Sequence, residues 1–154
     1  MSQHASRTQV SPERSQEEIK RTLRRYGASE FVQGETDERV SIGFRFGGLA
    51  FRMDVELPDK SEFSETPTGR GRRGDAAHRE WEQAIRQRWR ALLLAIRAKL
   101  EAIETGISTV EWEFMPFAVM ADGQRIGDVM APQLEAAKTS GRPLRFDRML
   151  AAEA

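Results

Sequence analysis

The residues with the most recognisable spacing for chemistry form the run GRGRRG, residues 69–74. Its glycines match the G-x-G-x-x-G fingerprint with which dinucleotide-binding proteins hold a pyrophosphate. That mechanism needs a strand directly before the run and a parallel strand after the following helix. Here the preceding strand-like alternation ends at Leu57 and belongs to an antiparallel hairpin. We therefore interpret the run as a basic loop, which is either simply solvated or grips phosphates.

Arginines continue from this loop along one line of the helix that follows it. Arginine binds phosphate in a bidentate manner, so the strip predicts a phosphate-tracking surface whose affinity falls with salt. The alternative is a solvated flank whose charge is offset by neighbouring glutamates through i,i+4 pairs. The strip comprises Arg70, Arg72, Arg73, Arg79, Arg86, Arg90 and Arg97, and the offsetting residues are Glu80, Glu82, Glu101 and Glu104.

Three further residues join this candidate nucleic-acid surface. Arg45 and Arg52 point to the open face of the predicted sheet and are second choices for phosphate contacts. Trp112 is the candidate for stacking on a single-stranded base, although a core position suits it equally well. Trp81 and Trp89 lie on the apolar face of the long helix and are interpreted as core or subunit-interface residues.

Other chemistry has few residues to work with. Cysteine is absent, which excludes disulfides, thiolate zinc sites and a cysteine nucleophile. His4 and His78 are isolated, and no P-loop, G-x-S-x-G or H-E-x-x-H motif occurs. We predict no catalytic residue, cofactor or metal, and favour a non-enzymatic role. An acidic run lies around the end of the hairpin. We interpret it as a solvated edge, with the binding of a hard cation as the alternative. Its residues are Asp54, Glu56, Asp59, Glu62 and Glu65.

The composition bounds the class of protein. The chain has 154 residues, which suits one domain, with 24 basic and 24 acidic residues and zero net charge. The net charge therefore gives no electrostatic steering toward nucleic acid. The basic residues are mostly arginine, which suits phosphate binding but is also explained by a GC-rich genome. No apolar run approaches the roughly 20 residues of a membrane span, and residues 1–10 lack a secretory core segment. We expect a cytoplasmic protein without membrane contact.

The elements that position these residues form an α+β fold. A helix begins at the cap Ser11-Pro12, with a second capping box at Ser15 and Glu18, and ends at Gly27. Residues 28–32 form a short strand and residues 35–38 a turn. A hairpin follows, in which the Gly47-Gly48 turn fixes the pairs Phe46 with Leu49, Phe44 with Phe51, Ile42 with Met53 and Val40 with Val55.

The opposite face of this sheet, with Arg45, Arg52, Asp54 and Glu56, is expected to be wet. Residues 58–74 form a flexible basic loop. Residues 75–105 form one very long amphipathic helix, roughly 45 Å at 1.5 Å per residue. A three-stranded sheet cannot cover such a helix, so its surplus needs the C-terminal region or another subunit.

A small mixed C-terminal region completes the domain, which spans residues 11–140 between tails at 1–10 and 141–154. We expect a short helix near residues 110–115 with a capping box at Ser108 and Glu111, a strand at 117–120, and a turn at Asp122-Gly123. A helix over residues 129–139 ends at Gly141. Its stripe of Met130, Leu134 and Ala137 is predicted to face inward.

Four runs carry a resemblance to known sequences, and they are SPERSQEEIKRTLRRYGASEF, VELPD, WEQAIRQRWRALLLAIRAKLEAIETGI and DGQRIGDVMAPQLEAA. Together they resemble an uncharacterised family of small bacteriophage and prophage proteins over most of residues 11–140. The resemblance implies phage origin and a location in the host cytoplasm. It implies no activity and no functional residues.

The order of a helix, three antiparallel strands and a long helix is also similar to the core of single-strand annealing proteins, which form oligomeric rings with a basic groove. We therefore expect a phage nucleic-acid-binding protein that acts in recombination or replication as a homo-oligomer, with single-stranded DNA favoured over double-stranded DNA. The alternative is a protein–protein interaction module, such as a phage inhibitor of a host or defence protein. It would use the exposed sheet face or the acidic loop.

Overall fold

The computed structural model describes residues 8–141, so most of the predicted N-terminal tail and nearly all of the predicted C-terminal tail lie outside the described residues. The architecture confirms the predicted α+β class. In chain order the elements are α1 (Pro12–Arg25), β1 (Ser29–Glu35), β2 (Arg39–Phe46), β3 (Leu49–Glu56), the 3-10 helix η1 (Lys60–Phe63), α2 (Gly74–Glu104), α3 (Val110–Phe114), the 3-10 helix η2 (Met115–Phe117) and α4 (Ile126–Ser140).

The β2–β3 hairpin has the register that the sequence predicts. Phe46 pairs with Leu49, Phe44 with Phe51, Ile42 with Met53 and Val40 with Val55. Gly47 and Gly48 have φ angles of 57° and 82°, a left-handed turn that a residue with a Cβ adopts only with strain. The two-residue turn leaves no freedom to slip, so alternate side chains fall on one face.

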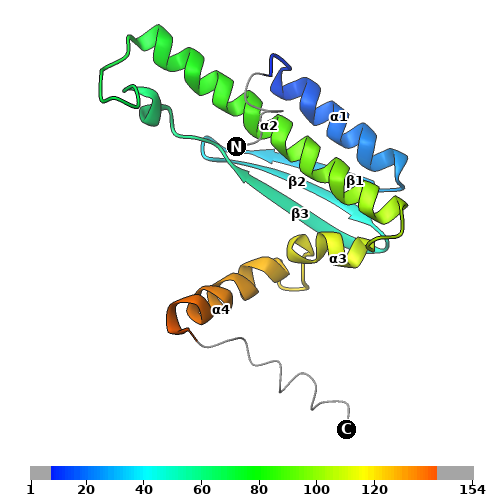
Figure 1. Ribbon diagram of the computed structural model, residues 1–154. Helices are drawn as coiled ribbons and strands as arrows, with labels where there is room; N and C mark the ends of the chain where they lie inside the picture. The colour runs from blue at the N-terminus through cyan, green and yellow to red at the C-terminus, as the bar shows by residue number, and fades with distance from the viewer. Residues whose placement is uncertain (1–7, 142–154) are drawn as a thin grey trace.

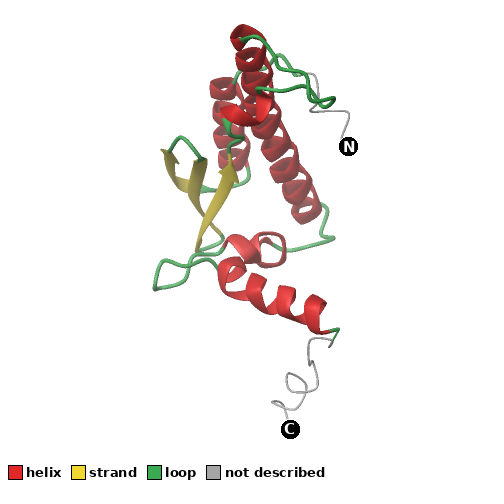
Figure 2. Cartoon of the chain, turned by 90° about the vertical axis from the view of Figure 1, so that its left-hand side faces the viewer, coloured by secondary structure: helices red, strands yellow, loops and turns green. Residues whose placement is uncertain are grey.

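Helices α1 and α2 lie side by side on that apolar face, and no helical layer formed by residues 8–141 covers the opposite face of the sheet (Figures 1 and 2). The long stripe predicted for α2 enters the core, where Leu93, Ile96 and Leu100 are fully buried. Ile19 and Leu23 of α1 pack into the same cluster. Burying such side chains contributes roughly 1.5–3 kcal/mol each, so this layer holds the fold together.

Local signals in α1 are partly as predicted. The Ser11 side chain accepts a hydrogen bond from the backbone N–H of Arg14, and Pro12 takes the first helical position. The second capping box is wrong, because Ser15 lies inside the helix and is buried. Its hydroxyl has no hydrogen-bond partner in the described structure. The other member of the predicted box, Glu18, points instead toward α2.

Strand β1 is longer than predicted and lies at the edge of the sheet. It reaches Glu35, so the following turn begins one residue later than expected. The strand order is β1-β2-β3, and pairing with β2 shifts between Ser29 and Val32. This irregularity contains Glu30, whose φ is 54°. Only the part from Val32 onward pairs regularly, and its outer edge has no strand beside it in residues 8–141.

The surplus of α2 lies at its N-terminal end and is not covered by the C-terminal region, which contacts α2 through α3. Its first turns project beyond the sheet, and the connection between β3 and α2 folds back along them (Figure 1). The Trp81 Nε1 donates a hydrogen bond to the Pro58 carbonyl at 2.8 Å. The 58–74 segment, predicted to be a flexible loop, contains η1, capped by Asp59, and a bridge between Glu65 and Gly71.

The C-terminal region, residues 107–141, is attached to the end of the sheet. Phe114 of α3 is fully buried, with its ring 5.7 Å from Phe44 and 5.5 Å from Phe51. Thr109, not Ser108, caps α3. The predicted strand 117–120 is reduced to two isolated bridges, Ala118 with Phe51 and Val119 with Arg125. Gly123 and Gly141 have positive φ, as the predicted turn and helix stop require.

The prediction for the last helix is wrong in one respect that matters for function. Helix α4 begins at Ile126, three residues before the predicted start, and contains no buried residue. Met130 and Leu134, predicted to face inward, are 39% and 45% exposed. Ala137 is half-buried. The helix projects from the end of the molecule, away from the α1–α2 layer (Figure 1).

Candidate interaction surfaces

The arginine flank of α2, defined as Arg86, Arg90 and Arg97, faces α1. Glu18 of α1 forms ion pairs with both Arg90, at 3.6 Å, and Arg97. The Glu18 side chain is largely shielded from water. The offset of charge therefore comes from a neighbouring helix, whereas the sequence suggested glutamates on the same helix. Arg86 donates two hydrogen bonds to the Gln83 side chain.

Three more of the candidate arginines have partners within the chain. Arg72 donates to the carbonyls of Phe63 and Glu65 and so pins the loop instead of facing outward. Arg45 pairs with Glu30 at 2.6 Å on the open sheet face. Arg52 lies 3.5 Å from the Asp54 carboxylate. With the arginine flank, six of the nine candidate arginines are engaged internally.

The remaining three, Arg70, Arg73 and Arg79, are exposed and have no ion pair within residues 8–141. They lie in the loop before α2 and in the first turns of that helix, and we call them the basic end. Arg73 is the N-cap residue of α2. The structure thus reduces the seven-arginine strip to a short cluster.

Trp112 does not belong to that cluster. It is 73% exposed, as a stacking residue requires, but it lies in α3, beyond the opposite end of α2. A helix of 31 residues spans roughly 45 Å. The predicted nucleic-acid site is therefore split between the two ends of the molecule.

Exposed apolar side chains concentrate in the C-terminal region, which contains Trp112. Eight large hydrophobic residues are exposed in the described chain, and six of them fall within residues 107–134. Soluble monomers seldom gather exposed apolar groups in this way unless the surface binds something. The six are Ile107, Trp112, Met115, Val129, Met130 and Leu134.

Polar contacts hold the start of α4 against the sheet. Arg125 pairs with Asp54 of β3 at 3.2 Å and with Asp128 at 2.6 Å. The predicted wet face is thus partly covered, and the Asp54 side chain is only 7% exposed. The hydrogen bond from Arg125 lowers the pKa of Asp128 below its ordinary value of 3.8. Gly127 is required at its position, because a Cβ there would lie 2.7 Å from the Pro116 carbonyl oxygen.

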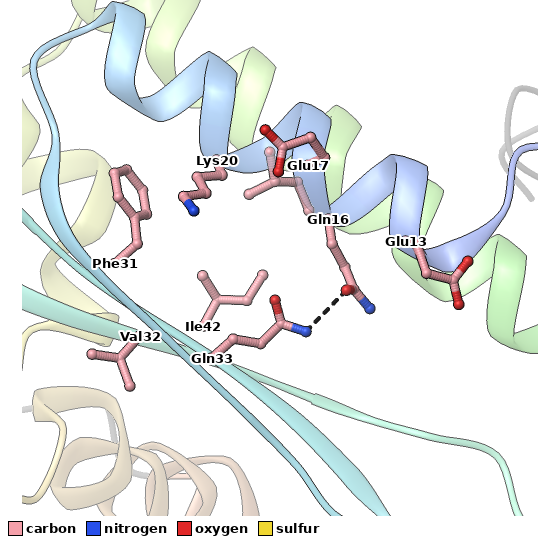
Figure 3. Close-up of a pocket in the computed structure, with 9 residues that line it drawn as sticks. Glu13, Gln16, Glu17, Lys20, Phe31, Val32, Gln33 and Ile42 are labelled. Carbon is pink, nitrogen blue, oxygen red and sulfur yellow. Dashed lines mark hydrogen bonds between the residues drawn. The ribbon is translucent and has the colours of Figure 1, made fainter.

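A hollow of about 180 Å³ lies between α1 and the edge strand β1, and we call it the edge hollow (Figure 3). Ile19, Ile42 and Phe31 contribute its apolar surface. At one end the Gln33 side chain donates a hydrogen bond to the Gln16 side chain at 3.0 Å. Charged residues of α1 line its upper rim, and they are Glu13, Glu17 and Lys20.

The acidic surface that was the other candidate docking area is dispersed. A shallow hollow of about 610 Å³ is lined by Glu35, Asp37, Glu38 and Asp59 around Trp81. Of the predicted acidic run, only Asp59 lines it, while Asp54 pairs with Arg125. Within residues 8–141 no three His, Cys, Asp or Glu side chains are arranged to hold a metal ion.

Comparison with known protein families, with curated proteins and with solved structures finds no match to this chain. No helix among the described residues is long and apolar enough to cross a membrane.

Sequence reasoning missed the surface that the structure exposes most clearly. The apolar stripe of α4 was recognised but assigned to the core. The signal that could have corrected this assignment is the sheet itself, because its apolar face is only three strands wide and two helices already cover it. Ile107 and Val129 carried no sequence signal, since single apolar residues in short segments are common in both cores and surfaces.

Proposed function

We propose that this protein is a protein-interaction module that binds its partner through the C-terminal region. One observation carries the proposal: α4 is a 15-residue helix without a buried residue, although it has an apolar stripe. Isolated helices of this length are marginal in water, and most helical stability in proteins comes from packing an apolar face. The stripe of α4 therefore needs a surface that the described chain does not provide.

The spacing of the exposed residues suggests the kind of partner. Met130, Leu134 and Ala137 recur at intervals of four and three residues, which is the pattern of a helix that docks into an apolar groove. Residues 107–141 contain five acidic and two basic residues. A groove with basic residues at its rim would complement them. The phage resemblance of the sequence directs the search to host and phage proteins of an infected cell.

The experiment is site-specific cross-linking in such cells. A photoreactive amino acid replaces Leu134, and a matched sample carries it at Ala95, an exposed position on α2. We expect one defined adduct from position 134 and none from position 95. Purified partner should then bind the wild-type chain and lose at least tenfold in affinity with Met130→Ser/Leu134→Ser.

The double variant must keep the thermal midpoint of the wild type, since neither side chain is buried. The proposal is contradicted if position 134 yields no adduct, or if the purified partner binds the double variant as tightly as the wild type.

A second function, nucleic-acid binding, rests on the basic end. Arg70, Arg73 and Arg79 are exposed and lack acidic partners in the described chain, so their guanidinium groups are available to phosphates. Single-stranded DNA remains the preferred ligand in this proposal, as in recombination or replication. Because only three arginines contribute, we expect a modest dependence on salt, with a slope near −2 in log Kobs against log salt.

Fluorescence anisotropy with labelled single- and double-stranded DNA at two salt concentrations tests this function. Arg70→Ala/Arg73→Ala/Arg79→Ala should abolish binding. The matched control is Arg14→Ala/Arg21→Ala/Arg88→Ala, which removes the same charge from exposed positions elsewhere on the helices. Equal losses in both triple variants, or no binding of the wild type at low salt, would exclude a site at the basic end.

A further inference from the structure

We infer that the edge hollow and strand β1 form a two-fold interface with a second copy of this chain. The inference is independent of the proposed function, which concerns the other end of the fold. It starts from β1, whose outer edge has no neighbouring strand in residues 8–141. Unpaired edges are templates for another strand, and proteins usually protect them with lysine, proline or a bulge.

Strand β1 is protected over only half of its length. The bulge interrupts residues 29–32, but the part from Val32 to Glu35 pairs regularly with β2 and contains neither proline nor a basic residue. Val32 is 69% exposed there. A regular edge with an exposed β-branched side chain favours the addition of a strand.

The charges on α1 identify that strand as belonging to another copy. The flank of α1 beside β1 carries, in chain order, Glu13, Glu17, Lys20 and Arg24. The first three line the edge hollow, and the guanidinium of Arg24 lies 5.2 Å from the centre of the Phe31 ring. The pattern is two negative charges followed by two positive charges. When such a helix meets itself in antiparallel orientation, Glu13 faces Arg24 and Glu17 faces Lys20 of the other copy.

A single two-fold axis is compatible with both the antiparallel approach of the two α1 helices and the contact between the two β1 strands. Gln16 hydrogen-bonds to Gln33, and Arg24 lies over Phe31, so α1 and β1 run in opposite directions with matching levels. The centre of the charge pattern, between Glu18 and Ile19, therefore falls near the level of Val32 and Gln33. An axis there brings the two exposed Val32 side chains together, as an isologous interface requires.

The dimensions of the layers support the contact between helices. Packed helices lie about 8–10 Å apart and strands about 4.8 Å apart, so two helices are wider than three strands. Because α1 and α2 share one face of three strands, α1 lies close to the β1 edge. The two β1 edges would meet at Val32, where the bulge limits strand pairing to the residues next to the axis, and the two α1 flanks would then lie against each other. In this arrangement the edge hollow of each copy would be covered by its own α1 on one side and by the other copy on the other side.

Charge reversal tests the inference in sedimentation experiments on the full chain. We expect the wild type to be a dimer. Glu13→Lys/Glu17→Lys and Lys20→Glu/Arg24→Glu each place four like charges on the flank, so each alone should be monomeric, with dimerisation weakened on the order of 100-fold. An equimolar mixture of the two variants should recover a dimer that contains one chain of each, which a variant that had simply unfolded could not do.

A cross-link gives a second readout, because the chain contains no cysteine. Val32→Cys should form a disulfide-linked dimer on mild oxidation, whereas Leu49→Cys, another exposed apolar position, should not. A monomeric wild type at about 100 µM would overturn the inference. So would charge variants that remain dimers by themselves, or a dimer that Met130→Ser/Leu134→Ser disperses, since the contact would then lie in the C-terminal region.

Discussion

The arginine flank of α2 and the apolar stripe of α4 are both amphipathic patterns, and the structure uses them in opposite ways. The flank is charged, yet it faces α1, where Glu18 pairs with Arg90 and Arg97. The stripe is apolar, yet Met130 and Leu134 face solvent. A charged line on a helix is thus no guide to a binding surface when a second helix packs beside it.

The difference follows from what each surface can find within the chain. An arginine beside another helix needs only one acidic residue at the right level, and α1 supplies it. An apolar stripe can be buried only against another apolar surface. The apolar face of the three-stranded sheet is already covered by α1 and α2. The charges are satisfied internally and the apolar stripe is not, which is why we assign partner binding to the C-terminal region.

The largest expected effect is at the residue that fastens the C-terminal region to the core. Phe114→Ala should lower the free energy of unfolding by about 3–5 kcal/mol, because it empties a fully buried ring site against Phe44 and Phe51. Chemical denaturation measures this. A loss below about 1 kcal/mol would mean that the region is not anchored in the core.

Next in size is the ion-pair centre between the helices. Glu18→Gln should cost about 1–2 kcal/mol, since it leaves two partly buried arginines without their carboxylate. Denaturation of this variant beside Glu101→Gln, an exposed glutamate on α2, gives the comparison. If both variants unfold at the same denaturant concentration, the arginine flank is not used internally.

Substitutions in the apolar stripe of α4 should have little effect on stability, in contrast to the two changes above. We expect Met130→Ser/Leu134→Ser to change the free energy of unfolding by no more than about 0.5 kcal/mol, because it removes side chains that solvent already reaches. The same denaturation experiment measures it. Destabilisation of 2 kcal/mol or more would show that the stripe is packed within the chain.

The smallest effect concerns pH at the start of α4. Asp128 has a lowered pKa in the folded chain because Arg125 hydrogen-bonds to its carboxylate. A lowered folded pKa gives stabilisation that is present above the unfolded value, near 3.8, and is lost as pH falls through the folded value. Helical signal from α4 should therefore decline only below about pH 4. An NMR titration in which Asp128 protonates at its ordinary pKa would contradict this contact.

Sequence patterns predicted the fold where short-range rules decide it. The two-residue glycine turn fixed the register from Val40 to Val55, and the cap at Ser11 with Gly106 beyond the end of α2 bounded the two long helices. The patterns failed where a choice depends on which elements meet. Glu18 looked like a capping residue because its partners, Arg90 and Arg97, lie about seventy or more positions further along the chain.

The candidate site was harder to predict for the same reason. Exposure of Trp112 and Met130 depends on how much apolar surface the sheet has left after two helices have packed on it. Periodicity shows that a stripe exists and gives no information on what covers it. Of the basic end, Arg70 and Arg73 were correctly placed in the loop and Arg79 on the long helix, but their separation from the other candidates required the α1–α2 pairing.

Native-state hydrogen exchange of the isolated chain tests this contrast most directly, because one experiment reports on both surfaces. We predict that amides of α2 near Arg90 and Arg97 exchange only with global unfolding. Amides of α4 should exchange through local opening that costs no more than about 2 kcal/mol, since no buried side chain holds that helix. Protection of α4 equal to that of α2 would contradict the account, because the stripe would then be packed within the chain itself.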